Sequence, residues 1–322
     1  MEFDADFEVL QALLDSPPGH ERVREETPAE PADPIVLSLD ARLEGGRDEA
    51  HRDRLAEAPV YSSGQAPALG GFAPRPPLRL VSAEQTPKKP ETQPVRDQTV
   101  HPISAIGRIT AAFDGRVRYC TGTVIAERVV LTAAHCTFLR SDQNSEERDG
   151  FADWILFEPQ YSAGESLGSW AGTSAYVLSG WSDPKPGASA GPFDFALVAL
   201  DAPIAARTGT VGLLTNTEPA GPVTSFGYPR EPSTGYLFDG NRLYSTTGVI
   251  TDETAPGLIQ SENALTEGSS GGPWIIQHEG SLKIVGLNSA KPILSDAHTW
   301  SPILGDPFLN LLGKVLADMT GV

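Results

Sequence analysis

Three short segments of the chain carry residue types that together perform acyl transfer. One is a serine flanked by glycines, Gly268-Ser269-Ser270-Gly271-Gly272, whose glycines lack Cβ atoms and let a substrate carbonyl approach closely. If Ser270 attacks that carbonyl, the N–H groups of Gly268 and Ser270 can converge on the oxyanion, and one such donor lowers the barrier by about 3–4 kcal/mol. Taken alone, the segment fits a plain Gly/Ser turn between two strands equally well.

The other two segments supply the groups that activate a serine, which is a weak nucleophile without an adjacent base. A strand-like apolar run delivers His135, and Asp194 stands directly before the apolar run 195–200. The order His, Asp, Ser is one of three chain orders known for this triad. Asp201, at the far end of the same run, is the alternative acid. A buried core histidine and a strand-edge cap are the structural alternatives for His135 and Asp194.

These segments resemble the three signature sequences of chymotrypsin-like serine proteases: Thr132-Ala133-Ala134-His135-Cys136, Asp194-Phe195-Ala196-Leu197 and Gly268-Ser269-Ser270-Gly271-Gly272-Pro273. The resemblance covers about residues 98–322. It implies an all-β endopeptidase of two six-stranded antiparallel barrels with a C-terminal helix, which acts on a polypeptide substrate. His135 and Asp194 would come from the first barrel and Ser270 from the second. Gly227-Tyr228-Pro229 and the stretch 96–109 are similar to the glutamyl-endopeptidase branch.

The resemblance also implies which residues form the specificity pocket. Ala264 marks its base, where an acidic residue would select Lys or Arg, so trypsin-like specificity is disfavoured. Asn288, followed by Ser289, stands where glutamate-specific members carry His, and Asn has no positive charge. Thr266 is then the candidate hydrogen-bonding partner for a polar side chain. His298, nearby in sequence, could substitute for the missing His, but we expect it in a surface loop. Small, apolar and polar uncharged side chains remain open as substrates.

Family members commonly carry a disulfide at the positions of Cys120 and Cys136, the only two cysteines. Such a bridge would stabilise the fold by about 3 kcal/mol in the chain-entropy model; two buried free thiols, as in a reducing compartment, are the alternative. No second Cys/His pair has ligand spacing, so no metal is predicted, and nothing suggests a cofactor. Ser269 replaces the Asp that pairs with a freed N-terminal amine in many animal members, so that activation switch is expected to be missing.

Composition bounds the class of protein and its partners. The 39% hydrophobic content, 32 glycines and 28 prolines favour a turn-rich β fold. The net charge of −18 argues against nucleic acid or an anionic membrane as partner, and no run of ~18 apolar residues predicts a membrane span. The acidic start of the chain does not resemble a secretory signal. Because such proteases are usually exported, we nevertheless expect a secreted or periplasmic enzyme.

Residues 1–97 differ in kind from the rest, since they hold nearly half of the prolines but no tryptophan and no cysteine. This composition predicts a mostly disordered segment, with a short amphipathic helix over 2–15 and short strands over 35–39 and 77–81. We interpret it as the propeptide of a zymogen or as a regulatory arm that inhibits the protease or binds a partner protein; a passive linker is the alternative. The protease domain would span 98–322, with processing near Arg96.

Strand patterns recur at the spacing typical of antiparallel barrels or sandwiches. We expect strands over 105–112, 117–126, 128–132, 154–157, 174–178, 195–200, 222–229, 243–250 and 282–289, a surface loop over 140–150 and a closing helix over 307–316. The leading hypothesis is an active serine endopeptidase. A catalytically idle protease-like binding module and an effector protease recruited through its N-terminal arm are the alternatives. The complete set of triad and glycine residues argues against the idle module.

Overall fold

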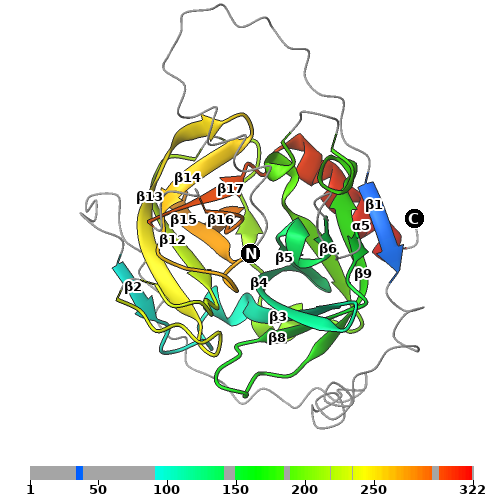
Figure 1. The fold of residues 1–322 in the computed structure, drawn as a ribbon, viewed down its shortest axis with the longest axis horizontal. Helices are drawn as coiled ribbons and strands as arrows, with labels where there is room; N and C mark the ends of the chain where they lie inside the picture. Colours follow the sequence, from blue (N-terminus) through cyan, green and yellow to red (C-terminus); the bar gives the residue numbers. More distant parts are fainter. Residues whose placement is uncertain are drawn as a thin grey trace, which may run out of the picture.

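The computed structural model describes residues 34–38, 91–140, 149–184, 189–217, 219–233, 235–291 and 297–320, with the side chains of 34–38 and 252–255 left aside. The expected helix over 2–15, the strand over 77–81 and most of the loop over 140–150 lie outside these residues. Two large sheets stand side by side, each curved into a barrel (Figure 1). In the described part of the chain, no helix is long and apolar enough to cross a membrane.

The first sheet contains seven strands in the order β1-β9-β10-β5-β4-β3-β8, and an additional β8–β9 pairing closes six of them into a barrel. Its strands are β1 (Pro34–Ser38), β3 (Ile106–Phe113), β4 (Arg116–Ala126), β5 (Val129–Thr132), β8 (Trp154–Pro159), β9 (Trp170–Leu178) and β10 (Ala196–Leu200). The strand β1 is the one expected near 35–39, and it extends the sheet at the outer edge of β9.

The second sheet contains eight strands along the path β11-β16-β15-β12-β13-β14-β17, with β2 paired to β13. They are β2 (Glu91–Pro94), β11 (Gly212–Leu213), β12 (Gly221–Gly227), β13 (Tyr244–Ala255), β14 (Leu258–Glu262), β15 (Pro273–His278), β16 (Ser281–Leu287) and β17 (His298–Pro302). A bridge between Ala290 and Trp300 joins the continuation of β16 to β17 and completes the ring. The antiparallel two-barrel prediction is confirmed, although the two-residue β11 pairs in parallel with β16.

Short elements connect the strands. They are the 3-10 turns η1 (Ile103–Ala105), η2 (Ala134–Cys136) and η3 (Gly191–Phe193), the helices α3 (Ser179–Ser182), α4 (Ala205–Thr208) and α5 (Asp306–Thr320), and a hairpin of β6 (Phe138–Leu139) and β7 (Gly150–Phe151). The strands expected from the sequence within the described residues are all present within a few residues. The sequence did not predict β2, β6, β7, β11, β14, β15 and β17. The prediction that His298 lies in a surface loop was wrong, because this residue opens β17.

The C-terminal helix joins the two barrels. It follows β17 of the second barrel, yet it packs against β9 and β10 of the first (Figure 1). Its buried residues are Phe308, Leu311 and Val315, and the Phe308 ring meets Phe195 edge-on at 5.4 Å between centroids. Because the core cluster that contains these side chains also includes Phe226 and Ile275 of the second barrel, the helix helps to fix one barrel against the other.

Candidate active site

Strand pairing brings His135 and Asp194 together. β5 and β10 are antiparallel, with Ala196 opposite Thr132, so the residues just beyond these positions, in η2 and after η3, must be neighbours. The Asp194 carboxylate accepts hydrogen bonds from His135 Nδ1, at 2.8 Å to Oδ2 and 3.1 Å to Oδ1, and from the His135 backbone N–H at 3.0 Å. Since an ionised carboxylate can only accept, Nδ1 carries the proton and Nε2 is left as an acceptor.

Asp194 stays ionised although it is almost completely buried. Burial alone would raise the pKa of its carboxyl, but the neighbouring His135 and the hydrogen bonds from His135 and Ser289 outweigh it and hold the pKa below the ordinary value. The Ser289 hydroxyl donates to Asp194 Oδ2 at 2.5 Å. A permanent negative charge therefore faces the His135 ring. Asp201, the alternative acid, lies at the surface at the other end of β10.

The loop that carries Ser270 is held against the first barrel. The Ser270 carbonyl accepts the Thr121 N–H at 2.8 Å, and the Cys136 Sγ lies 3.9 Å from the same oxygen. Gly271 has φ +80°, and a Cβ there would lie 2.2 Å from Thr132 Oγ1, so only glycine permits this approach. The serine of the second barrel is thus anchored between strand β4 and the turn that carries His135.

The N–H groups of Gly268 and Ser270 have no hydrogen-bond acceptor among the described residues. The preceding carbonyl, that of Glu267, accepts the Arg230 N–H at 2.7 Å. Because the C=O and N–H of a trans peptide point in opposite directions, this bond turns the Gly268 N–H away from Arg230. Gly268 has φ +88°, and a Cβ there would lie 2.4 Å from the Tyr228 carbonyl oxygen. The loop therefore offers two free donors in the arrangement expected of an oxyanion hole.

Asn288 braces the same loop from within the second barrel. Its Oδ1 accepts from Asn263 Nδ2 and Trp274 Nε1, both at 2.8 Å. Its Nδ2 donates to the carbonyls of Phe226 at 2.9 Å and Ser269 at 3.0 Å. The side chain is buried, so every polar atom of this amide is engaged inside the protein.

The backbone of Asn288 binds the loop as well. Its carbonyl accepts the Gly271 N–H at 2.7 Å, and its N–H donates to the Gly272 carbonyl at 2.8 Å. Side chain and main chain together therefore fix the residues on both sides of Ser270.

The remaining residues expected in the pocket lie in the same region. Thr266 donates its hydroxyl to the Glu231 carbonyl at 2.7 Å, so its hydrogen is already used. Ala264 is half-buried and directly follows Asn263, whose carbonyl accepts from Lys291 Nζ at 3.3 Å. Ser289 serves Asp194 as described above. Roles of these residues in substrate binding stay predictions.

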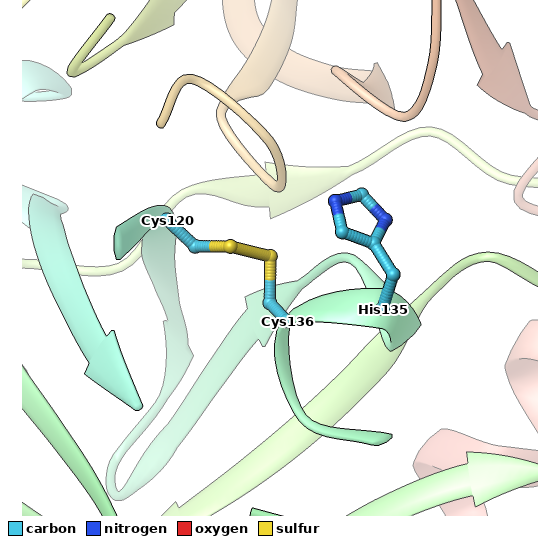
Figure 2. A group of neighbouring side chains, drawn as sticks. All are labelled: Cys120, His135 and Cys136. Carbon is cyan, nitrogen blue, oxygen red and sulfur yellow. A yellow bond between two sulfur atoms is a disulfide. The ribbon is translucent and has the colours of Figure 1, made fainter. Parts of the chain in front are cut away.

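A disulfide links Cys120 of β4 to Cys136 of η2, with 6.1 Å between the Cα atoms. Figure 2 shows the bridge beside the His135 ring, which extends from the same turn. The two sulfurs and a ring nitrogen lie within 4.8 Å of one another, but the sulfurs are bonded to each other and offer no thiolate. The disulfide therefore fixes the turn that carries His135, as the family resemblance implied.

Two neighbours of the site were not found from the sequence. Trp181 of α3 lies 6.3 Å from the His135 ring between centroids, and its Nε1 donates to the Phe138 carbonyl at 3.1 Å. The Tyr119 ring has the guanidinium of Arg108 at 5.1 Å and that of Arg230 at 5.8 Å. Neither spacing nor composition indicated Trp181 or Tyr119. Of the residues in these contacts, only Arg230 stands beside a sequence motif, because it follows the Gly227-Tyr228-Pro229 tripeptide.

Comparisons with known proteins identify the family of the chain. Residues 120–287, just over half of the chain, match the family model of the trypsin-like peptidase domain. The chain therefore belongs to the trypsin-like peptidase family, and it is a serine endopeptidase. No curated protein matches it by sequence.

Solved structures of proteases share the fold. The protease Anisep from Arthrobacter nicotinovorans is 23% identical, with a TM-score of 0.58 over 70% of this chain and 100% of that one. The thermostable serine protease AL20 from an extremophilic microorganism is 24% identical, with a TM-score of 0.54 over 66% of this chain and 96% of that one. A Glu endopeptidase in complex with MPD is 23% identical, with a TM-score of 0.56 over 70% and 96%.

Proposed function

We propose that the chain cleaves peptide bonds through a triad of Ser270, His135 and Asp194 and an acyl-enzyme intermediate. The observation that carries the proposal is the buried, ionised Asp194 bonded to His135 Nδ1. It leaves Nε2 of the same ring as the base. Ser270 would attack the carbonyl carbon while His135 takes its proton. His135 would then return the proton to the leaving amine, and water would release the acyl group by the reverse path.

The proposed oxyanion hole supports this assignment. The N–H groups of Gly268 and Ser270 would bind the negative oxygen of each tetrahedral intermediate. The Arg230 N–H, bonded to the Glu267 carbonyl, would keep the first of these donors in place. These contacts favour an active enzyme over the idle binding module, since nothing in the described site occupies either donor.

Specificity is proposed only in outline. Ala264 at the pocket base provides no acid for a Lys or Arg side chain, and the Asn288 amide is fully engaged within the protein. One structural neighbour is described as a Glu endopeptidase. This chain carries Asn288 at the position where the family resemblance implies a histidine in glutamate-specific members. We propose a preference for small, apolar or polar uncharged side chains before the cut, with Ala264, Ser289 and the backbone around Asn288 and Thr266 as the lining.

The N-terminal segment is proposed to be a propeptide or regulatory arm, with processing near the exposed Arg96. The strand β2 lies just before this position and pairs with β13, with Glu91 opposite Thr247 and Pro94 opposite Tyr244. A cut after Arg96 would therefore leave residues 91–94 seated on the second barrel. The disulfide fits a secreted or periplasmic enzyme, and we propose that location.

Labelling with a fluorophosphonate, which phosphonylates an activated serine with loss of fluoride, tests the triad. We expect the wild-type chain to be labelled and the Ser270→Ala chain to be unlabelled. Ser281→Ala is the matched control, because Ser281 is exposed in β16 and outside the site; it should label like the wild type. A folded wild-type chain that resists the probe, or a Ser270→Ala chain that still reacts, would contradict the proposed nucleophile.

A further inference from the structure

The outer edge of β9 is left open by the barrel itself. Along one edge, β9 pairs with β10. Along the other, β8 pairs only with Trp170 and Ala171, because the two strands then diverge. Among the described strands, β1 alone pairs with the rest of that edge, with Pro34 opposite Leu178 and Ser38 opposite Ser174. Five residues of the N-terminal segment thus complete the first sheet.

The chemistry of this edge selects an extended apolar strand. Ala175, Tyr176, Val177 and Leu178 are all at most 3% exposed, so β9 is covered on both faces here. A strand that joins such a sheet needs apolar residues at successive positions rather than in alternation. The sequence Ile35-Val36-Leu37 meets that requirement. Without an occupant, the backbone N–H and C=O groups of this edge would lose their partners in apolar surroundings.

The open edge of β9 is connected to the candidate active site through α3 and β10. β9 runs into α3, and Trp181 of that helix packs with Ala134, Val177 and Ala196 and faces the His135 ring. β10, on the other side of β9, begins two residues after Asp194. A strand at this edge therefore supports the elements that hold His135 and Asp194, from the flank of the barrel opposite β10 (Figure 1).

We propose that the β9 edge at residues 174–178 is a docking site for an extended apolar peptide, and that its occupant is residues 34–38 of this chain. The arm stays bound there through strand pairing after the chain between β1 and β2 is cut. In this role β1 stabilises the protease domain, whereas an inhibitory segment would block the active site. The proposal goes beyond the triad and does not depend on it, because binding can be measured on an inactive chain.

The experiment uses the full chain carrying Ser270→Ala, with a recognition sequence for an unrelated specific protease inserted after Gly64. After the cut, gel filtration under native conditions shows whether the N-terminal fragment stays with the body. We expect the two pieces to elute together. In a second chain, Val36→Pro and Leu37→Pro remove two successive backbone donors, one of which must face β9. That fragment should separate from the body.

Matched prolines at Ala56→Pro and Ala58→Pro, in the segment between β1 and β2, should leave the fragment bound. Amide hydrogen exchange of residues 174–178 gives a second readout on the uncut chains. We expect exchange there to be about tenfold faster or more in the Val36→Pro/Leu37→Pro chain than in the control. Release of the unmodified fragment, retention of the Val36→Pro/Leu37→Pro fragment, or equal exchange in both chains would overturn the proposal.

Discussion

Replacing Asn288 with leucine tests whether this side chain holds the nucleophile loop or contacts substrate. Leucine has a similar size but cannot accept or donate a hydrogen bond. The change leaves Trp274 Nε1–H and an Asn263 amide N–H without their 2.8 Å acceptor. Both residues are completely buried, so water cannot replace the lost partner. Each buried donor without an acceptor costs about 1–3 kcal/mol, and the free energy of unfolding should fall by about 2–6 kcal/mol.

The loop itself loses one contact, from Asn288 Nδ2 to the Ser269 carbonyl, while that carbonyl keeps the Gly272 N–H at 2.9 Å. We therefore expect the loop to shift without unfolding. Misplacement of a reacting group by about 1 Å can cost about 10²-fold in rate, so fluorophosphonate labelling should slow by up to that factor. The ranking of substrates by the residue before the cut should stay the same, because both polar atoms of the Asn288 side chain are engaged within the protein.

Urea unfolding of the Ser270→Ala chain, with and without Asn288→Leu, measures the change in the free energy of unfolding without self-digestion. Asn241→Leu is the matched control, because Asn241 is half-buried and, among the described residues, its Oδ1 receives one contact, at 3.5 Å from the Tyr161 hydroxyl; it should lower stability by about 1 kcal/mol or less. Labelling and peptide-library cleavage with the active chain supply the other readouts. A loss below about 1 kcal/mol for Asn288→Leu, or a changed substrate ranking, would refute this reasoning.

Four further perturbations test the rest of the site. Asp194→Asn should lower kcat by about 10⁴-fold, because an amide facing Nδ1 favours the wrong tautomer. Because the pKa of Asp194 is lower in the folded than in the unfolded chain, its ionised form stabilises the fold above the ordinary carboxyl range, and this stability is lost as pH falls through the folded-state pKa. Below about pH 4, the urea midpoint should therefore drop more steeply with falling pH for the wild type than for Asp194→Asn. Parallel curves for the two chains would contradict this. Ser289→Ala removes a hydrogen bond to a buried carboxylate and should cost about 1.5–3 kcal/mol of stability and lower kcat with little change in KM; an unchanged kcat would argue against a positioning role. Gly268→Ala places a Cβ against the Tyr228 carbonyl, so kcat should fall by about 10²–10³-fold while Gly280→Ala, at a positive-φ turn with open space around it, leaves kcat intact. Replacing Cys120 and Cys136 together by serine should lower the free energy of unfolding by about 3 kcal/mol, measured by urea unfolding against the wild-type chain with its disulfide intact.

The sequence identified most of the first barrel and the C-terminal helix because their signals are local. β3, β4, β5 and β10 are apolar runs that end at turns or polar residues, and the amphipathic pattern of α5 repeats over several turns. The strands that could not be predicted lack such signals. β2 has the sequence ETQP and β17 the sequence HTWSP, which become strands only because β13 and β14 present open edges to them.

The three residues of the proposed triad and the paired cysteines could be named from the sequence, because a few residue types in a fixed order are typical of that chemistry. The hydrogen bonds that the side chains of Ser289, Thr266 and Asn288 make could not be predicted in this way. Ser289 reaches Asp194 across 95 residues of sequence, and Asn288 contacts four residues from separate parts of the second barrel. Hydrogen bonds of this kind depend on which strands become neighbours when the barrels close, and local residue patterns do not encode that. The sequence by itself determined which residue types stand in which order along the chain, and the closing of the two barrels decided which side chains hold them in place.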